Sequence, residues 1–282
     1  MNLRHFLKSI SPLVKLKRFT FSLFNFSFLN ILKTFKVFVP NSAGNYRTKA
    51  KQTIISVNGF PSAMIDFLEI HVSKSTLPQS VCDFVESFSH DSPSGVLGDF
   101  FSYFGSDKST NHNYDLVYEK ILGDPTRVRG ILEIGLGTNN TKIISTMGSA
   151  GKPGASLRAF RSYCPNARIF GADIDQDILF SEEKIQTFFV DQLDSNTFKH
   201  LARQLPSSLD LIIDDGLHSI DANIRTMTFA LPLLKVGGWL VIEDIGDNSL
   251  ELWKLIASLL PSYYSSTLVL AQNGSLFVVQ RL

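Results

Sequence analysis

From residue 129 to the C-terminus, short apolar runs alternate with stretches of helical periodicity, and this rhythm restricts the fold more than any other feature. The run Gly130–Ile134 ends at a glycine, as expected for a buried strand that leads into a turn. Strands that alternate with helices form a parallel sheet covered on both faces. The last two runs, Ser266–Leu270 and Ser275–Val279, flank Asn273–Gly274, a dipeptide that favours a hairpin. The sequence pattern therefore predicts an α/β domain with a mostly parallel sheet.

The remaining elements follow the same pattern. Further strands are expected at Ala167–Ala172, Thr187–Val190, Leu209–Ile213 and Trp239–Ile242, and helices at Ser156–Tyr163, Ser195–Leu205, Ile220–Leu234 and Leu250–Leu260. The pair Gly237–Gly238 is expected to end the third of these helices, and Pro261 the fourth.

Acidic side chains stand at the ends of five of these strands. They are Glu133, Asp173, Asp191, the pair Asp214 and Asp215, and the pair Glu243 and Asp244. Ligands of parallel sheets bind at the carboxyl ends of the strands. Solubility alone does not account for acids at so many strand ends, so we expect a binding site along this edge of the sheet.

Charge divides the chain into two unequal parts. No acidic residue precedes Asp66, whereas ten of the 27 basic residues lie between Arg4 and Lys51. The rest of the chain carries the other 17 basic residues and all 26 acidic ones, a net charge of −9. Nucleic-acid binding requires a basic face, so this acidic body argues against DNA or RNA as a partner. The two cysteines, Cys82 and Cys164, form no ligand cluster, which disfavours zinc and disulfides and indicates a cytoplasmic location.

Residues 1–50 form a basic, phenylalanine-rich segment, with eight phenylalanines in its first 40 residues. Its uncharged run, Phe19–Leu32, has 14 residues and is shorter than the ~20 that span a bilayer. Three interpretations stay open: peripheral contact with an anionic membrane, a targeting peptide, or an arm that packs on the main domain or on another subunit of a homo-oligomer. Asn41–Lys51 is expected to be a polar linker, residues 51–95 a cap or helical lead-in, and residues 96–282 the main domain.

The stretch Ile131–Gly137 resembles the first motif of class I S-adenosylmethionine-dependent methyltransferases. Gly135 and Gly137 let a ligand approach the backbone where a side chain would clash. Asp173, 38 residues after Gly135, stands where a carboxylate could accept hydrogen bonds from both ribose hydroxyls. Asp191 follows the next strand and could meet the adenine amino group. We therefore expect S-adenosylmethionine as the cofactor.

This resemblance implies a Rossmann-like α/β fold with a mostly parallel seven-stranded sheet, a C-terminal antiparallel strand and an N-terminal extension. Two other interpretations of the glycines stay open. They could make a tight turn only, or they could serve NAD, because an acid after the second strand also suits a dinucleotide. The third glycine of the dinucleotide fingerprint is missing, however, since Thr138, Asn139 and Asn140 follow Gly137.

A second cluster lies at the ends of two strands that a helical crossover would make neighbours. Asp215, Glu243 and Asp244 offer hard oxygen donors, which suit Mg²⁺ rather than zinc. His218 follows three residues after Asp215 and could take a proton from a substrate hydroxyl. Each residue also has an ordinary structural explanation: Asp215 as a helix cap, the Glu243–Asp244 pair as a solvated loop, and His218 as a surface residue.

Residues 100–282 resemble the metal-dependent O-methyltransferases that act on sugars of macrolide antibiotics, the macrocin and mycinamicin type. The matching pieces are Phe104–Lys108 with His112, Tyr114 and Tyr118, the loop at Gly135, Gly154–Arg158, Phe170–Asp175, Val190–Gln192 and the two acidic strand ends. The chain departs from this type at Leu217, in its long loop from Thr138 to Gly154, and in its N-terminal segment.

The resemblance implies specific roles for these residues and a sugar or glycan-type small molecule as the acceptor. The metal ligands would be Asp215, Glu243 and Asp244, the base His218, and the cofactor-binding residues Glu133, Gly135, Gly137, Asp173, Asp191, Gln192, Asp214, Lys108 and Tyr114. Lys108, His112 and Tyr114 would lie near the methionine end of the cofactor or near the acceptor. The alternatives are an NAD-dependent oxidoreductase and a nucleotide-binding protein without catalysis.

Overall fold

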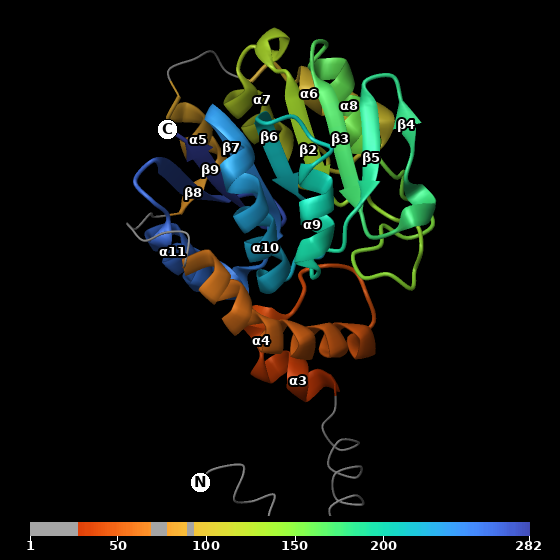
Figure 1. The fold of residues 1–282 in the computed structure, drawn as a ribbon, viewed down its shortest axis with the longest axis vertical. Coiled ribbons are helices and arrows are strands. Elements are labelled where there is room, and N and C mark those ends of the chain that lie inside the picture. Colours follow the sequence, from red (N-terminus) through yellow and green to blue (C-terminus); the bar gives the residue numbers. More distant parts are fainter. Residues whose placement is uncertain (1–27, 69–77, 89–92) are drawn as a thin grey trace, which may run out of the picture.

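A mixed sheet runs through the centre of the computed structural model, which describes residues 28–68, 78–88 and 93–282 (Figure 1). Among these residues the sheet has nine strands in the order β1-β8-β9-β7-β6-β2-β3-β5-β4. The strands are β1 (Gln79–Ser80), β2 (Gly130–Ile134), β3 (Arg168–Asp173), β4 (Ser181–Glu182), β5 (Ile185–Phe189), β6 (Leu209–Asp214), β7 (Leu234–Ile245), β8 (Tyr264–Leu270) and β9 (Ser275–Arg281).

Seven of these strands make the predicted sheet, and the two-residue strands β1 and β4 extend its edges. Strand β9 is antiparallel to both β7 and β8, which confirms the C-terminal hairpin and the single antiparallel strand of the seven. The chain runs outward from β2 to β3 on one side and from β6 to β7 on the other. The strand order therefore reverses between β2 and β6, and ligands bind at such a switch point.

Helices cover both faces of the sheet (Figure 1). The described helices are α3 (Phe28–Thr34), which packs on α4 rather than on the sheet, α4 (Tyr46–Leu68), α5 (Val81–Glu86), α6 (Val96–Phe104), α7 (Tyr114–Leu122), α8 (Ala155–Tyr163), α9 (Ser195–Ala202), α10 (Ile220–Ala230) and α11 (Leu250–Leu259). Side chains alternate across the sheet, so Leu132 packs with α9, α10 and α11, and its neighbour Ile131 with α5 to α8. The acid-bearing edge of the sheet thus lies between two hydrophobic cores.

The expected polar linker at Asn41–Lys51 is wrong in its second half, because α4 begins at Tyr46. Asn45 accepts a hydrogen bond from the Thr48 amide at 2.9 Å and so begins the helix. Ala50, Thr53 and Ser56 are buried on the inner side of α4, which packs against α10. Tertiary packing therefore outweighs the polar composition, and the expected boundary at residues 50/51 falls inside this helix.

The predicted helix Ile220–Leu234 is too long. Helix α10 ends at Ala230, a short 3₁₀ turn follows over Leu231–Leu233, and β7 starts at Leu234. Pro232 lies in this turn and has no amide hydrogen to continue the helix. The pair Gly237–Gly238 lies inside β7, close to where its register with β6 shifts, and does not end a helix.

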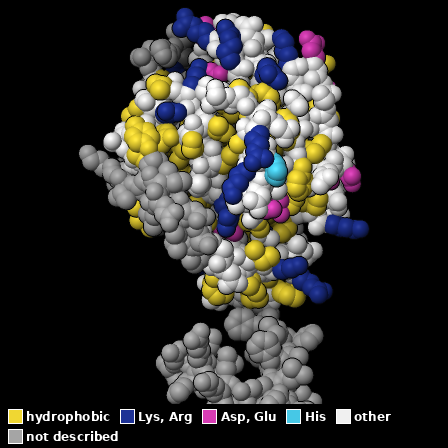
Figure 2. All heavy atoms as spheres, viewed as in Figure 1, with side chains coloured by type: hydrophobic (Ala, Val, Ile, Leu, Met, Phe, Trp, Pro, Cys, Tyr) yellow, Lys and Arg dark blue, Asp and Glu magenta, His cyan; other side chains and the backbone are white. Residues whose placement is uncertain are grey.

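The N-terminal segment is described only from Phe28 onward, so most of the phenylalanine-rich stretch lies outside the described residues. In the described part, Phe28, Leu29, Ile54 and Ile55 are exposed on α3 and α4. Figure 2 shows hydrophobic and basic side chains close together at this end of the molecule. Among the residues that the structure describes, no helix has both the length and the hydrophobicity needed to span a bilayer.

Candidate functional site

The glycine loop forms where the ends of β2, β3 and β6 meet. The Gly135 amide donates to the Ala172 carbonyl at 2.8 Å, and the Asp215 amide donates to the Ile134 carbonyl at 2.7 Å. Gly135 has φ +96°, and a Cβ there would lie 2.0 Å from the Asp215 carbonyl oxygen. Only glycine fits where these two backbone segments approach each other so closely. The loop is therefore required by the backbone as well as suited to a ligand.

A first cavity, here called the Asp173 pocket, opens on the β3 side of this loop. Its lining is largely apolar and includes Ile143, Ile174, Leu193 and Leu217, and Asp173 and Asp191 also line it. Asp173 accepts hydrogen bonds from the Leu136 amide at 2.7 Å and the Asp175 amide at 2.8 Å. Burial raises the pKa of Asp173, and these two backbone hydrogen bonds oppose the shift. A largely apolar pocket that is also lined by two carboxylates held by backbone amides suits a nucleoside.

Gln192 and Asp214 form a buried network behind the Asp173 pocket. Gln192 Nε2 donates to Asp214 Oδ1 at 2.7 Å, and Asn223 Nδ2 donates to Asp214 Oδ2 at 3.0 Å. The Leu217 amide in turn donates to Gln192 Oε1 at 2.7 Å. Gln192 lines the pocket, whereas Asp214 does not. Asp214 therefore acts on the pocket through its neighbours, by holding Gln192 and the loop at Leu217 in place.

A second cavity, the Asp215 pocket, lies next to the first and shares Gly135, Gly137 and Asp215 with it. Lys108, Tyr114, His112, His218, Glu243 and Asp244 are among the side chains that line it. The two cavities therefore meet at the glycine loop, on the carboxyl edge of the sheet.

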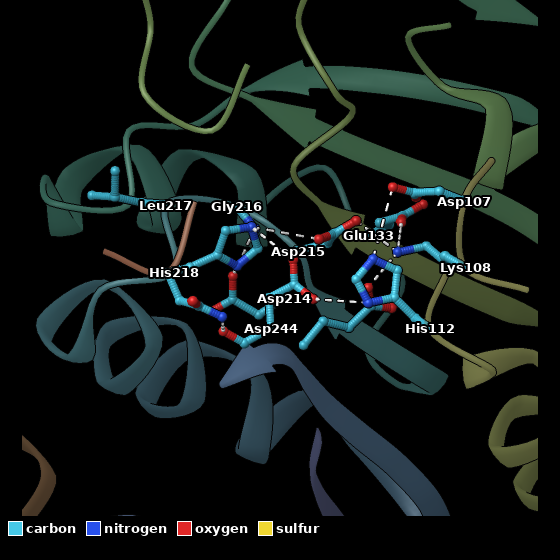
Figure 3. Close-up of polar contacts among 12 residues, drawn as sticks. Asp107, Lys108, His112, Glu133, Asp214, Asp215, Gly216, Leu217, His218 and Asp244 are labelled. Atoms are coloured by element: carbon cyan, nitrogen blue, oxygen red, sulfur yellow. Dashed lines mark hydrogen bonds and ion pairs between the residues drawn. The ribbon is translucent and has the colours of Figure 1, made fainter. Parts of the chain in front are cut away.

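Lys108 is the centre of a buried charge cluster in this pocket (Figure 3). Its ammonium lies 2.6 Å from Asp215 Oδ2, 2.6 Å from Glu243 Oε2 and 3.2 Å from Glu133 Oε1. Burial alone would lower the pKa of Lys108, but Asp215, Glu243 and Glu133 raise it well above its ordinary value. Burial raises the pKa of Glu133 and of Glu243, and the ammonium opposes both shifts. The ammonium of Lys108 therefore serves as the counter-ion of all three carboxylates in this cluster.

Three groups converge on one point on the other side of Asp215 (Figure 3). His218 Nε2 lies 3.6 Å from Asp215 Oδ1 and 3.8 Å from Asp244 Oδ2. One ligand atom from each of these three residues lies within 4.8 Å of the others, a spacing that could hold a metal ion. Tyr114 donates a hydrogen bond to the second oxygen of Asp244 at 2.8 Å and fixes the orientation of that carboxylate. The sequence-based expectation that Asp215, His218 and Asp244 lie together agrees with this geometry.

Glu243 points away from this convergence. Its side chain is 2% exposed, Lys108 binds one of its oxygens, and the Tyr118 hydroxyl donates to the other. Burial raises the pKa of Tyr118, so the phenol stays protonated as the donor. Of the three carboxylates predicted to hold a metal, Glu243 thus faces Lys108 and Asp244 faces His218. Asp215 lies between Lys108 and His218 and contacts both.

His218 and Asp244 both have left-handed backbone conformations, with φ of +52° and +55°. Non-glycine residues seldom adopt this region, and it costs about 1–3 kcal/mol where the surroundings impose it. The register between β7 and β9 shifts between Ile242 and Ile245, which turns the chain at Asp244. Strain of this kind at two converging side chains is a common feature of functional sites.

Some residues of the site received no role from the sequence, although Tyr118 and Ser156 lie in the pieces that match the macrolide-sugar O-methyltransferases. Tyr118 holds Glu243, and its position four residues after Tyr114 on α7 was a signal that both could face the same site. Ser156, on α8, donates to Glu133. Ser42 and Ala43 line the Asp215 pocket from the N-terminal segment, and the sequence carries no signal for this contact.

Comparisons with known proteins agree with the predicted resemblance. 8-Demethyl-8-α-L-rhamnosyl tetracenomycin-C 2′-O-methyltransferase of Streptomyces olivaceus is 34% identical over 144 residues, which are 50% of this chain and 35% of that protein. Mycinamicin VI 2″-O-methyltransferase of Micromonospora griseorubida is 40% identical over 93 residues, which are 33% of this chain and 23% of that protein. These matches span only about a third or less of the relatives' length. No protein-family model matches the chain.

A solved structure gives the same result for the fold. MycE methyltransferase from the mycinamycin biosynthetic pathway, in complex with Mg, SAH and mycinamycin VI, superimposes with a TM-score of 0.53 at 24% identity. The match covers 66% of this chain and 53% of that one. The expected Rossmann-like methyltransferase fold is therefore confirmed, and so is the resemblance to sugar O-methyltransferases of the mycinamicin type.

Proposed function

We propose that this chain is an S-adenosylmethionine-dependent, Mg²⁺-dependent O-methyltransferase that acts on a hydroxyl of a sugar or glycan-type small molecule. The observation that carries the proposal is the junction of the two cavities at Gly135 and Gly137. A nucleoside in the Asp173 pocket would direct its methionine end across this loop toward Asp215, His218 and Asp244. The donor methyl group and the acceptor oxygen would then meet at one place.

The Asp173 pocket supplies what the cofactor needs. Asp173, fixed by two backbone amides, would accept hydrogen bonds from the ribose hydroxyls. Asp191 would meet the adenine amino group, with Ile174 and Leu193 packing on the ring. NAD is less well suited, because its fingerprint needs a short loop from strand to helix. Here the chain from Leu136 to Gly154 separates β2 from α8.

The cofactor's methionine end would lie in the Asp215 pocket. Tyr114 and Lys108 both line this pocket. Glu133 is fully buried and binds Ser156 and Lys108. Its contribution to cofactor binding would therefore be indirect, through the position of Lys108.

The residues present fit a magnesium ion. Asp215 Oδ1 and Asp244 Oδ2 are hard donors that converge with His218 Nε2, and Mg²⁺ takes one or two carboxylates with water and substrate oxygens. Glu243 is the third carboxylate predicted from the sequence, and it would have to exchange its contact with Lys108 to join them. The metal would lower the pKa of a bound acceptor hydroxyl.

His218 would act on the same hydroxyl. Its side chain is 6% exposed, and Nε2 faces the two carboxylates, whereas Nδ1 is buried without a hydrogen-bond partner among the described residues. In this position Nε2 would accept the hydroxyl proton while the acceptor oxygen bonds to the methyl carbon and S-adenosylhomocysteine is released. A neighbouring oxygen on the acceptor, as in a vicinal diol, would complete the contact with the metal.

The proposal includes a cytoplasmic location and a small-molecule acceptor rather than a nucleic acid. Cys82 and Cys164 are both free, as a reducing compartment would keep them. Peripheral membrane contact and a homo-oligomer stay predictions from the N-terminal segment.

The proposed activity can be tested with S-adenosylmethionine that carries an isotope-labelled methyl group. The full-length protein would be incubated with glycosides that carry vicinal diols, with Mg²⁺ or with EDTA. We expect labelled methyl ether only with Mg²⁺, together with S-adenosylhomocysteine in equal amount. Equal transfer in EDTA would contradict the role of the metal, and cofactor binding without transfer to any of these glycosides would contradict the acceptor class.

A further inference from the structure

We propose that Asn41, from the N-terminal segment, is a positioning residue for the His218–Asp244 pair. This inference rests on the proposed function, because that pair belongs to the proposed metal centre. Asn41 lies far from both residues in the sequence and makes contact with each of them through a different group.

The contacts of Asn41 are backbone contacts on both strained residues. Its amide donates to the His218 carbonyl at 3.3 Å, and its side-chain Nδ2 donates to the Asp244 carbonyl at 2.8 Å. A carbonyl that is held in place fixes the ψ angle of its own residue. One residue therefore holds both of the left-handed conformations that aim His218 Nε2 and Asp244 Oδ2 at each other.

Close packing allows Asn41 to reach these carbonyls. A Cβ at Gly246 would lie 3.3 Å from Asn41 Cγ, so the asparagine side chain lies directly over this glycine. Gly246 follows Asp244 by two residues, just beyond the end of β7. A larger residue there would push Asn41 away from the Asp244 carbonyl.

The segment that carries Asn41 is anchored on both sides. Before it, Val37 packs on the hydrophobic core, and the Phe38 ring contacts the Phe60 ring of α4 at 5.2 Å between centroids. After it, α4 begins at Tyr46 and packs along α10, the helix that follows His218. Asn41 itself is exposed, but the segments packed on both sides of it restrict its position.

The N-terminal segment also reaches the Asp215 pocket. Ser42 and Ala43, which follow Asn41, line the Asp215 pocket together with Ser106 and His112. The N-terminal segment therefore takes part in the site directly. Asn41 itself has no role in the chemistry, since both of its hydrogen bonds are made to backbone carbonyls behind the reacting groups.

The test compares Asn41→Ala with Asn58→Ala in the full-length protein. Asn58 is an exposed asparagine of α4 and serves as the matched control. Mn²⁺ replaces Mg²⁺, and its binding is followed from the electron paramagnetic resonance signal of the free ion. Residues that orient metal ligands typically contribute 10–100-fold to affinity, so we expect Asn41→Ala to weaken Mn²⁺ binding at least about tenfold. Asn58→Ala should bind Mn²⁺ as the wild type does.

A second readout needs no metal. The ring signals of His218 in the NMR spectrum of histidine-labelled protein can be identified by their loss in His218→Ala. Alanine keeps the backbone amide that donates to the His218 carbonyl and removes only the Nδ2 contact with the Asp244 carbonyl. Because Asp244 Oδ2 lies 3.8 Å from His218 Nε2, a displaced Asp244 should shift the His218 signals in Asn41→Ala, and Asn58→Ala should leave them unchanged. An unshifted His218 signal in Asn41→Ala, or a Mn²⁺ affinity within about twofold of the wild type, would overturn the proposal. A wild-type protein that binds no Mn²⁺ would contradict the metal part of the proposed function, and the His218 signals would still decide the role of Asn41.

Discussion

Replacing Lys108 by methionine is expected to lower the free energy of unfolding by about 3–5 kcal/mol, because it leaves buried carboxylates without their counter-ion. Glu133 and Glu243 are 0% and 2% exposed, and Lys108 is the only cation within 4.0 Å of either one among the described residues. Urea unfolding at pH 8 measures the change. Lys142→Met, at an exposed lysine of the long loop between β2 and α8, is the matched control and should change stability little.

The pH dependence of the same variant separates lost charge from lost packing. Burial already raises the pKa of Glu133 and Glu243, and without the ammonium both should rise further. An acid with a raised folded-state pKa binds its proton preferentially in the folded protein, so stability increases as the pH falls toward the unfolded value. The deficit of Lys108→Met should therefore shrink between pH 8 and pH 5. A deficit that is small, or equal at both pH values, would contradict the charge cluster.

Replacing His218 by alanine is expected to reduce kcat by about 10²–10⁴-fold, the usual contribution of a general base. The dissociation constant of S-adenosylmethionine should change far less, because the nucleoside would bind in the Asp173 pocket, which His218 does not line, and only the methionine end would enter the Asp215 pocket, which it does. Steady-state kinetics with a glycoside acceptor and calorimetric binding of the cofactor measure the two effects. His200→Ala, at an exposed position on α9, is the control.

The two measurements on His218→Ala distinguish three roles. A loss of kcat with intact cofactor binding supports the base. If cofactor affinity falls as much as kcat, His218 holds the loop after β6 and is structural. If kcat is retained, another group takes the proton and the assignment is wrong.

The arrangement of the sheet could be predicted because its cause is local. Apolar runs such as Gly130–Ile134 are buried on both faces, and the connections between them are long enough for helices. The hairpin at Asn273–Gly274 follows from turn chemistry in the same way. The end of α10 was missed because a proline at residue 232 stops the helix, and β7 starts before the glycine pair that was expected to stop it.

The acidic strand ends could be placed on one edge, but the sequence does not show where each carboxylate points. Successive residues of a strand face opposite sides, so the two members of each acidic pair have different surroundings. Asp214 lies in a buried network while Asp215 faces the pocket, and Glu243 binds Lys108 while Asp244 faces His218. At Asp244 a left-handed backbone also sets the direction of the side chain, and the sequence does not show that conformation.

Contacts over long sequence separations were beyond sequence reasoning for the same reason. Lys108 was placed near the cofactor or the acceptor, but its three carboxylate partners come from β2, from β7 and from the residue that follows β6. Asn41 lies in a stretch that composition marks as a linker. Its contact with Asp244 exists only because α4 packs on α10 and brings the preceding segment to the edge of the sheet.

The central claim, a methyltransferase site built around Asp173, is tested most directly by calorimetric titration of the full-length protein with S-adenosylmethionine and, separately, with NAD. We expect one site for S-adenosylmethionine, no heat with NAD, and loss of the binding in Asp173→Ala. Asp177→Ala, at an exposed residue shortly after Asp173 in the sequence, should bind as the wild type does. Binding of NAD in place of S-adenosylmethionine, or S-adenosylmethionine binding that Asp173→Ala leaves intact, would contradict the account.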